Sequence, residues 1–231
     1  MTATAVRSAR NRTALHPYSF RALVTALLVL LAAPQAAYAD RSGDFDYYVL
    51  ALSWSPTYCE RAGRKADPLQ CRASKPYRFI VHGLWPQYER GYPDFCDTGA
   101  RSRLDAGTVG TILDIMPSRG LASHQWIKHG SCSGLDPQAY FALTRRAFEA
   151  VRIPAAFRSV AKTERTSATA VETAFRLANP GLRDNAIAVS CEAGRLSEVR
   201  ICLTRDLRFR SCPFVDRNGC RSAGLTVPPP R

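Results

Sequence analysis

Histidine side chains are concentrated in two short motifs of this chain. One motif is Val-His-Gly-Leu-Trp-Pro at residues 81–86, and the other is His-Gln-Trp-Ile-Lys-His-Gly-Ser-Cys at residues 124–132. The chain has four histidines, and only His16 lies outside these motifs. Because imidazole titrates near neutral pH, clustered histidines beside Lys128 indicate acid–base chemistry on an anionic substrate.

The second motif brings its polar side chains together if residues 124–130 are helical. At about 100° per residue, four of them share one sector of the helix, namely His124, Gln125, Lys128 and His129. Trp126 and Ile127 then fall on the opposite side, where they can pack into the core. If His82 faces the polar sector, three imidazoles line one cleft.

This set of side chains meets the needs of RNA cleavage by transesterification. A base must remove the 2′-hydroxyl proton, an acid must protonate the departing 5′-oxygen, and cationic or hydrogen-bonding groups must stabilise charge on phosphorus. Two histidines supply the base and the acid without a metal ion. Since the reaction requires the 2′-hydroxyl, DNA would not be cut.

Two other interpretations of the histidines remain open. They can be hydrogen-bonding residues of the core and loops, or they can be zinc ligands. His124 and His129 are spaced i, i+5, which suits zinc less well than the i, i+4 spacing of zinc-binding helices. Neither motif contains an acidic residue or an unpaired cysteine that would complete a ligand set. We therefore expect no metal and no other cofactor.

Strand patterns flank the first motif. Residues 45–54 are aromatic and β-branched with partial alternation, which predicts a strand, and residues 77–82 predict a second one. Gly83 and Pro86 should end that second strand, so that His82 lies at a strand end. Residues 57–75 and 87–103 are predicted to be loops.

Helices should occupy much of the middle of the chain. Asp136 as N-cap and Pro137 at the first helical position predict a helix that runs to about residue 152. Its buried face should carry Tyr140, Leu143, Ala147, Phe148 and Val151. Further helices are predicted at residues 106–116, 121–129 and 166–177, and strands at 186–191 and 197–204. Strands near both ends with helices between them indicate an α+β domain.

The first 39 residues are predicted to be a signal peptide. Four arginines precede the apolar segment at residues 22–33, and Ala37-Tyr38-Ala39 fits a cleavage site before Asp40. The alternative is an uncleaved membrane anchor, although the apolar segment is short for a spanning helix. Residues 40–231 should form one domain without a membrane span, with residues 225–231 as a disordered tail.

Charge and cysteine content agree with an exported protein. Removal of the four leader arginines lowers the formal net charge from +13 to +9, and a strongly basic domain favours polyanionic partners. An even number of cysteines in an exported chain predicts disulfides. All eight follow the leader, at Cys59, Cys71, Cys96, Cys132, Cys191, Cys202, Cys212 and Cys220. Their spacing alone does not choose among the possible pairings.

The two histidine motifs resemble the active-site segments of the ribonuclease T2 family. The similarity extends over most of residues 45–220, including Trp-Ser-Pro-Thr-Tyr-Cys at 54–59. It implies a disulfide-stabilised α+β domain with a central antiparallel sheet and packed helices. It also implies disulfides between Cys59 and Cys71, Cys96 and Cys132, Cys191 and Cys220, and Cys202 and Cys212.

The resemblance also implies a role for each residue of the candidate site. His129 would be the general base and His82 the general acid. His124 would bind phosphate, and Lys128 would stabilise the transition state. Trp85 and Tyr88 would stack on a base of the RNA substrate.

Gln125 departs from the family pattern, which usually has Glu between the His and the Trp of the second motif. Glutamine cannot titrate, but its amide can donate a hydrogen bond to a phosphoryl oxygen.

Taken together, the motifs, the leader and the resemblance predict a secreted or periplasmic, monomeric endoribonuclease that cleaves single-stranded RNA through a 2′,3′-cyclic phosphate without metal. The alternative is a catalytically weakened relative that binds RNA or anionic surfaces through its charge.

Overall fold

The computed structural model describes residues 1–2, 40–98 and 104–230. The predicted signal peptide therefore lies almost entirely outside the described residues. In the described part of the chain, no helix is both long enough and apolar enough to cross a membrane.

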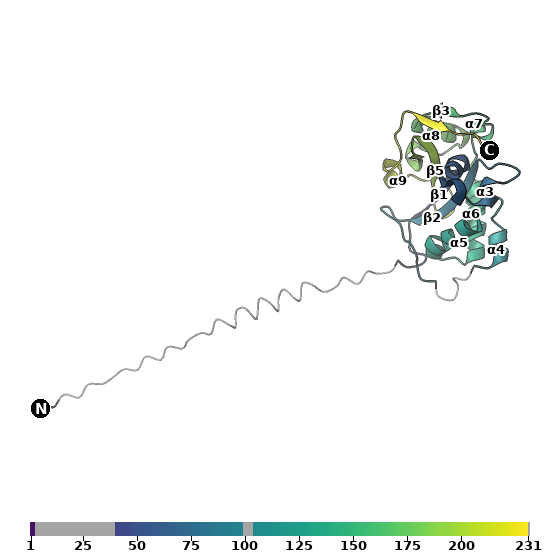
Figure 1. The fold of residues 1–231 in the computed structure, drawn as a ribbon. Helices are drawn as coiled ribbons and strands as arrows, with labels where there is room; N and C mark the ends of the chain where they lie inside the picture. Colours follow the sequence, from purple (N-terminus) through teal and green to yellow (C-terminus); the bar gives the residue numbers. More distant parts are fainter. Residues whose placement is uncertain (3–39, 99–103, 231) are drawn as a thin grey trace. The chain divides into compact units, whose positions relative to one another are not determined.

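One mixed sheet of six strands forms the centre of the described chain (Figure 1). The order is β2-β1-β5-β6-β3, and β4 pairs with the free side of β5. All neighbours are antiparallel except β5 and β6, which share one parallel pair. The strands are Tyr47–Trp54 (β1), Phe79–Gln87 (β2), Glu164–Thr166 (β3), Ile187–Glu192 (β4), Arg195–Leu203 (β5) and Leu225–Val227 (β6).

The second strand contains a β-bulge at His82. Ala51 of β1 pairs with Gly83 and Leu52 pairs with Val81, so that His82 is the extra residue between them. Side chains alternate along a strand, so a regular strand would place His82 on the same face as Leu84, which is in the core. The bulge shifts that alternation and puts His82 on the face that carries Trp85.

Helices cover the sheet and supply the rest of the core. Helices α5 and α6 contact β2, whereas α8 contacts β4. The predicted buried face of α6 is confirmed for Tyr140, Leu143, Ala147 and Val151, while Phe148 is partly buried. The helices are Ser55–Ala62 (α2), Pro68–Cys71 (α3), Ala106–Gly110 (α4), Arg119–Lys128 (α5), Pro137–Glu149 (α6), Ala155–Arg158 (α7), Ala168–Ala178 (α8) and Pro213–Arg217 (α9). Short 3₁₀ turns occupy Gly63–Lys65, Gly130–Ser133 and Asp184–Ala186.

The predicted α+β class, central sheet and disulfide pairing are confirmed. The four bonds join Cys59 to Cys71, Cys96 to Cys132, Cys191 to Cys220 and Cys202 to Cys212. Because structural disulfides persist in oxidising surroundings, this fold belongs to an oxidising compartment.

Three local predictions are wrong. Residues 57–75 are not a loop but carry α2 and α3, because Pro56 and Pro68 occupy first-turn positions and begin helices. Gly83 and Pro86 do not end β2, so His82 is not at a strand end. The tail is not disordered at Leu225–Val227, which pairs with β3, and the indole of Trp54 donates a hydrogen bond to the carbonyl of Pro228.

The helix predicted at residues 106–116 is shorter than expected. Only Ala106–Gly110 is α-helical, and residues 111–115 continue as turns. The helix predicted at 121–129 instead begins at Arg119, where Ser118 caps it by accepting a hydrogen bond from the Leu121 amide.

Candidate active site

The two histidine motifs meet at one pocket. It is lined by the polar face of α5 together with β2, and the lining includes His82, Trp85, His124, Gln125, Lys128 and His129. The predicted helical arrangement of the second motif is confirmed up to Lys128, and His129 caps the helix with its amide bonded to the Gln125 carbonyl at 3.0 Å. Trp126 is buried as expected, but Ile127 is not in the core, with 54% of its surface exposed.

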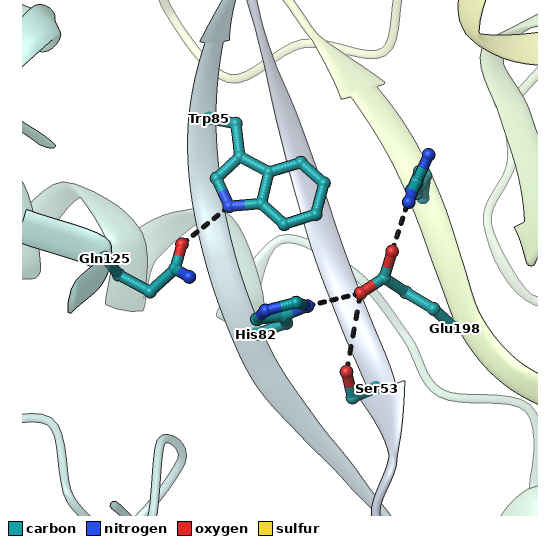
Figure 2. A network of polar contacts seen from close by, with 6 residues as sticks. Ser53, His82, Trp85, Gln125 and Glu198 are labelled. Atoms are coloured by element: carbon teal, nitrogen blue, oxygen red, sulfur yellow. Dashed lines mark hydrogen bonds and ion pairs between the residues drawn. The ribbon is translucent and has the colours of Figure 1, made fainter. Parts of the chain in front are cut away.

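His82 is held by a carboxylate on its side away from α5. Its Nδ1 lies 2.6 Å from Oε2 of Glu198, which is on β5 (Figure 2). The other carboxylate oxygen accepts a hydrogen bond from Nε of Arg200 at 2.7 Å. Burial opposes ionisation of Glu198, but its contacts with His82 and Arg200 prevail and lower its pKa. The carboxylate therefore holds the His82 ring through its Nδ1 atom.

His129 has the opposite environment. It is buried, with only 7% of its surface exposed. Burial and, secondarily, the charges of Lys128, His82 and His124 lower the pKa of His129 to about 3. Its Nδ1 atom is buried without a hydrogen-bond partner among the described residues. His129 is therefore a neutral imidazole over most of the pH range, which allows it to accept a proton.

Trp85 separates these two imidazoles. Its ring centroid lies 5.2 Å from that of His82 and 5.3 Å from that of His129. The indole Nε1 donates a hydrogen bond to Oε1 of Gln125 at 2.6 Å, as Figure 2 shows. Gln125 is buried, and its oxygen is committed to Trp85. The carboxamide thus fixes the orientation of the indole between the two histidines.

The other predicted base-stacking residue, Tyr88, is not among the residues that line this pocket. Its hydroxyl donates a hydrogen bond to Asp40 at 3.1 Å. Tyr92 lines the pocket instead, with its ring centroid 5.9 Å from that of His129. The Lys128 ammonium lies 5.6 Å from the centroid of Tyr92 and 5.8 Å from that of Phe95.

The glycines of both motifs permit close packing around the pocket. A Cβ on Gly83 would overlap the amide oxygen of Gln125 and Nε1 of Trp85. A Cβ on Gly130 would lie 2.5 Å from the Trp126 ring. The Tyr140 hydroxyl also donates a 2.9 Å hydrogen bond to the Leu84 carbonyl, which ties α6 to β2. The close approach of Gln125 on α5 to β2 therefore depends on the absence of a side chain at Gly83.

Glu198 and Arg200 were not predicted from the sequence. The signal that would have found them is their i, i+2 spacing within the predicted strand, which places two charged side chains on one face of the sheet. Among the described residues, no group of three or more His, Cys, Asp and Glu side chains is arranged to hold a metal ion.

Comparison with known proteins gives a family-level match. The model of the family described as "Ribonuclease T2 family" matches residues 45–212. A ribonuclease of Aeromonas hydrophila is 36% identical over 191 residues, which cover 79% of this chain and 85% of that protein. A probable ribonuclease of Haemophilus influenzae is 36% identical over 121 residues, or 47% of this chain and 44% of that protein.

Solved structures show the same fold. Trichomaglin, described as a novel S-like ribonuclease, superposes with a TM-score of 0.63 at 25% sequence identity. The superposition covers 80% of this chain and 98% of trichomaglin.

Proposed function

The chain belongs to the ribonuclease T2 family and is an endoribonuclease, and from this premise we propose that it is a secreted or periplasmic enzyme that cleaves single-stranded RNA by metal-independent transesterification. The observation that carries the proposal is the pair of imidazoles in one pocket with opposite surroundings. When environments favour different protonation states for two such groups, one is suited to act as acid and the other as base.

His129 is the general base in this proposal. Its neutral ring takes the proton of the ribose 2′-hydroxyl, and the 2′-oxygen then attacks phosphorus. Lys128 and His124 line the same pocket and stabilise the negative charge that develops on the phosphoryl oxygens. Their roles were inferred from the family resemblance, and their positions in the pocket support them.

His82 is the general acid. Its protonated ring gives a proton to the 5′-oxygen as the bond from phosphorus to that oxygen breaks. The products are a 2′,3′-cyclic phosphate and a free 5′-hydroxyl. Two imidazoles supply both proton transfers, so no step needs a metal ion.

Convergence of these side chains on one pocket favours catalysis over RNA binding through charge alone. A protein that only bound RNA would need its basic surface but would not need acid and base on opposite sides of one site. The four disulfides and the predicted leader support export.

The test compares an oligoribonucleotide with the same oligonucleotide carrying 2′-deoxyribose at every position, both in EDTA. We expect cleavage of the first substrate only, with a cyclic phosphate on the upstream product. A double variant, His82→Ala with His129→Ala, purified in the same way controls for contaminating ribonuclease. Cleavage of the deoxy substrate, or activity abolished by EDTA, contradicts the proposal.

A further inference from the structure

We propose that Glu198 is a positioning residue for the acid step: it fixes the proton on Nδ1 of His82 and turns Nε2 toward the leaving group. The proposal rests on the ribonuclease function proposed above. The contact that carries it is the 2.6 Å hydrogen bond between Nδ1 of His82 and Oε2 of Glu198. The two residues are 116 positions apart in the chain. They come together because β2 and β5 both pair with β1.

Glu198 is built into the sheet so that its carboxylate has little freedom. The side chain is 8% exposed, and its two oxygens have different partners. One accepts the 2.6 Å contact with His82 and a longer 3.4 Å hydrogen bond from the Ser53 hydroxyl on β1. The other accepts from Arg200 at 2.7 Å. Figure 2 shows one oxygen of the Glu198 carboxylate facing both His82 and Ser53.

This geometry decides which nitrogen of His82 is free to react. A carboxylate accepts hydrogen bonds only, so Nδ1 of His82 must carry a proton in both protonation states of the ring. In the acid step the proton on Nε2 goes to the 5′-oxygen, the bond from phosphorus to that oxygen breaks, and the proton on Nδ1 stays in place. Glu198 touches neither the substrate nor the reacting atoms in this scheme.

Other charged groups around His82 do not provide the same contact. His124 and Lys128 of α5, with His129 at its C-terminal cap, line the pocket on the other side of His82, and none of the three has a carboxylate. A second hollow that His82 also lines contains Arg61 of α2 and Glu192 of β4, which form an ion pair with each other at 3.0 Å. Among these charged neighbours, Glu198 is the carboxylate that contacts the His82 ring.

The first measurement is ¹⁵N NMR of the unliganded domain, residues 40–231, labelled at histidine. Only three imidazole rings need to be assigned, because this part of the chain has three histidines. In free histidine the neutral ring carries its proton mainly on Nε2. We expect neutral His82 to carry it on Nδ1 instead. A neutral His82 that is protonated on Nε2 overturns the proposal, whatever the activity of the enzyme.

The second measurement compares Glu198→Gln with Glu192→Gln, which removes the same charge from the neighbouring strand without contacting His82. We expect Glu198→Gln to lower kcat about tenfold or more, with little change in KM, and to move the alkaline limb of the pH–rate profile to lower pH. Glu192→Gln should keep the parent values. An unchanged kcat and limb in a folded Glu198→Gln variant overturns the proposal.

The two measurements separate this inference from the proposed function. A protein with the Nδ1 proton on His82 that does not cleave RNA would refute the ribonuclease chemistry and leave the positioning contact intact. Cleavage of RNA with the opposite tautomer would refute the positioning role alone. If Glu198→Gln does not fold, the NMR result for the parent protein decides.

Discussion

At the scale of single residues, the two central histidines of one pocket differ in what surrounds them. His82 has a buried carboxylate against Nδ1, whereas His129 has Lys128 as its chain neighbour and no carboxylate contact among the described residues. Both are ordinary imidazoles in the sequence. Their proposed division into acid and base rests on the Glu198 contact across the sheet for His82 and on burial for His129.

The acid limb of the pH–rate profile should lie at unusually low pH. His129 accepts a proton only while it is neutral, and its pKa is lowered to about 3 by burial, Lys128, His82 and His124. As pH falls through this value the ring becomes protonated and kcat/KM should fall with it, whereas activity should persist at about pH 5. Lys128→Gln removes one of the charges that lower this pKa, so it should move the limb to higher pH.

The measurement is kcat/KM against pH for the parent and Lys128→Gln, with circular dichroism at each pH to show that the protein is folded. A parent limb with its midpoint above pH 5 would contradict the assignment of His129 as a buried neutral base. A lower rate for Lys128→Gln at every pH is expected as well, because in the proposed mechanism the ammonium stabilises phosphoryl charge.

Gln125 offers a second prediction at this scale. Its oxygen accepts the Trp85 indole, and a glutamate carboxylate would accept the same bond. Gln125→Glu should therefore keep Trp85 in place while adding a negative charge close to His129, which moves the acid limb to higher pH. Gln125→Ala removes the acceptor, so Trp85 should become mobile and turnover should fall.

Trp85 fluorescence and pH–rate profiles of both Gln125 variants test this prediction. Trp54 and Trp126 are the other indoles, and both are buried in the core, so their signal should be constant. Replacing both by Phe in a reference protein isolates the Trp85 signal if that reference remains folded. If Gln125→Ala leaves the rate and the Trp85 signal unchanged, the hydrogen bond does not position the indole.

At the scale of elements, the bulge in β2 is the feature that assembles the pocket. It places His82 on the same face as Trp85, and the absence of a side chain at Gly83 lets Gln125 approach. Neither property can be read from residues 77–87 alone. The bulge is a property of pairing with β1, and the steric role of Gly83 depends on a helix that begins 36 residues later.

Local signals were sufficient for other elements. Asp136 and Pro137 predicted the start of α6, and the Asp136 side chain does accept a hydrogen bond from the Ala139 amide. In contrast, the loop predicted at residues 57–75 was wrong, because Pro56 lies in the first turn of α2, a position that suits proline. The histidines and Lys128 were found from their motifs. Glu198 was not, because its function comes from a contact across the sheet.

A substitution at Gly83 tests the packing of α5 against β2. The Cβ of Gly83→Ala would overlap Gln125 and Trp85, and overpacking of this kind typically costs about 1–3 kcal/mol of stability. Activity should fall further than the folded fraction, because both displaced side chains belong to the pocket. Gly110→Ala is the matched control, since a Cβ there meets nothing within 4 Å. It should change stability by less than about 1 kcal/mol.

Urea unfolding and initial rates measured on the same preparations separate these effects. A Gly83→Ala protein as stable and as active as Gly110→Ala would show that α5 can withdraw from β2 without damage to the site.

At the scale of the whole molecule, disulfides join segments that are separated in the sequence. The Cys96–Cys132 bond joins the loop that carries Tyr92 and Phe95 to the turn that follows α5. The same loop is tied by a 2.8 Å hydrogen bond from the Phe95 amide to the Lys128 carbonyl. The Cys59–Cys71 bond, in contrast, joins α2 to α3, neither of which contains a residue of the two histidine motifs.

These two bonds should therefore differ in what their removal does to catalysis. Loss of either should cost about 2–4 kcal/mol of stability, with the larger loss for Cys96–Cys132, which spans 36 residues rather than 12. Removal of Cys96–Cys132 should also free the Tyr92 loop from Lys128. Because small displacements at a site cost large factors in rate, kcat/KM of the folded fraction should drop about tenfold or more.

The variants are paired Cys→Ser substitutions at each bond, studied at a temperature where both remain folded. The parent should show no free thiols after denaturation without reductant, and each paired variant should show none either. Efficiency per folded molecule then distinguishes a bond that only stabilises from one that also shapes the site. Equal efficiency in the two paired variants would mean that the backbone hydrogen bond to Lys128 is enough to hold the loop, and that the covalent link contributes to stability alone.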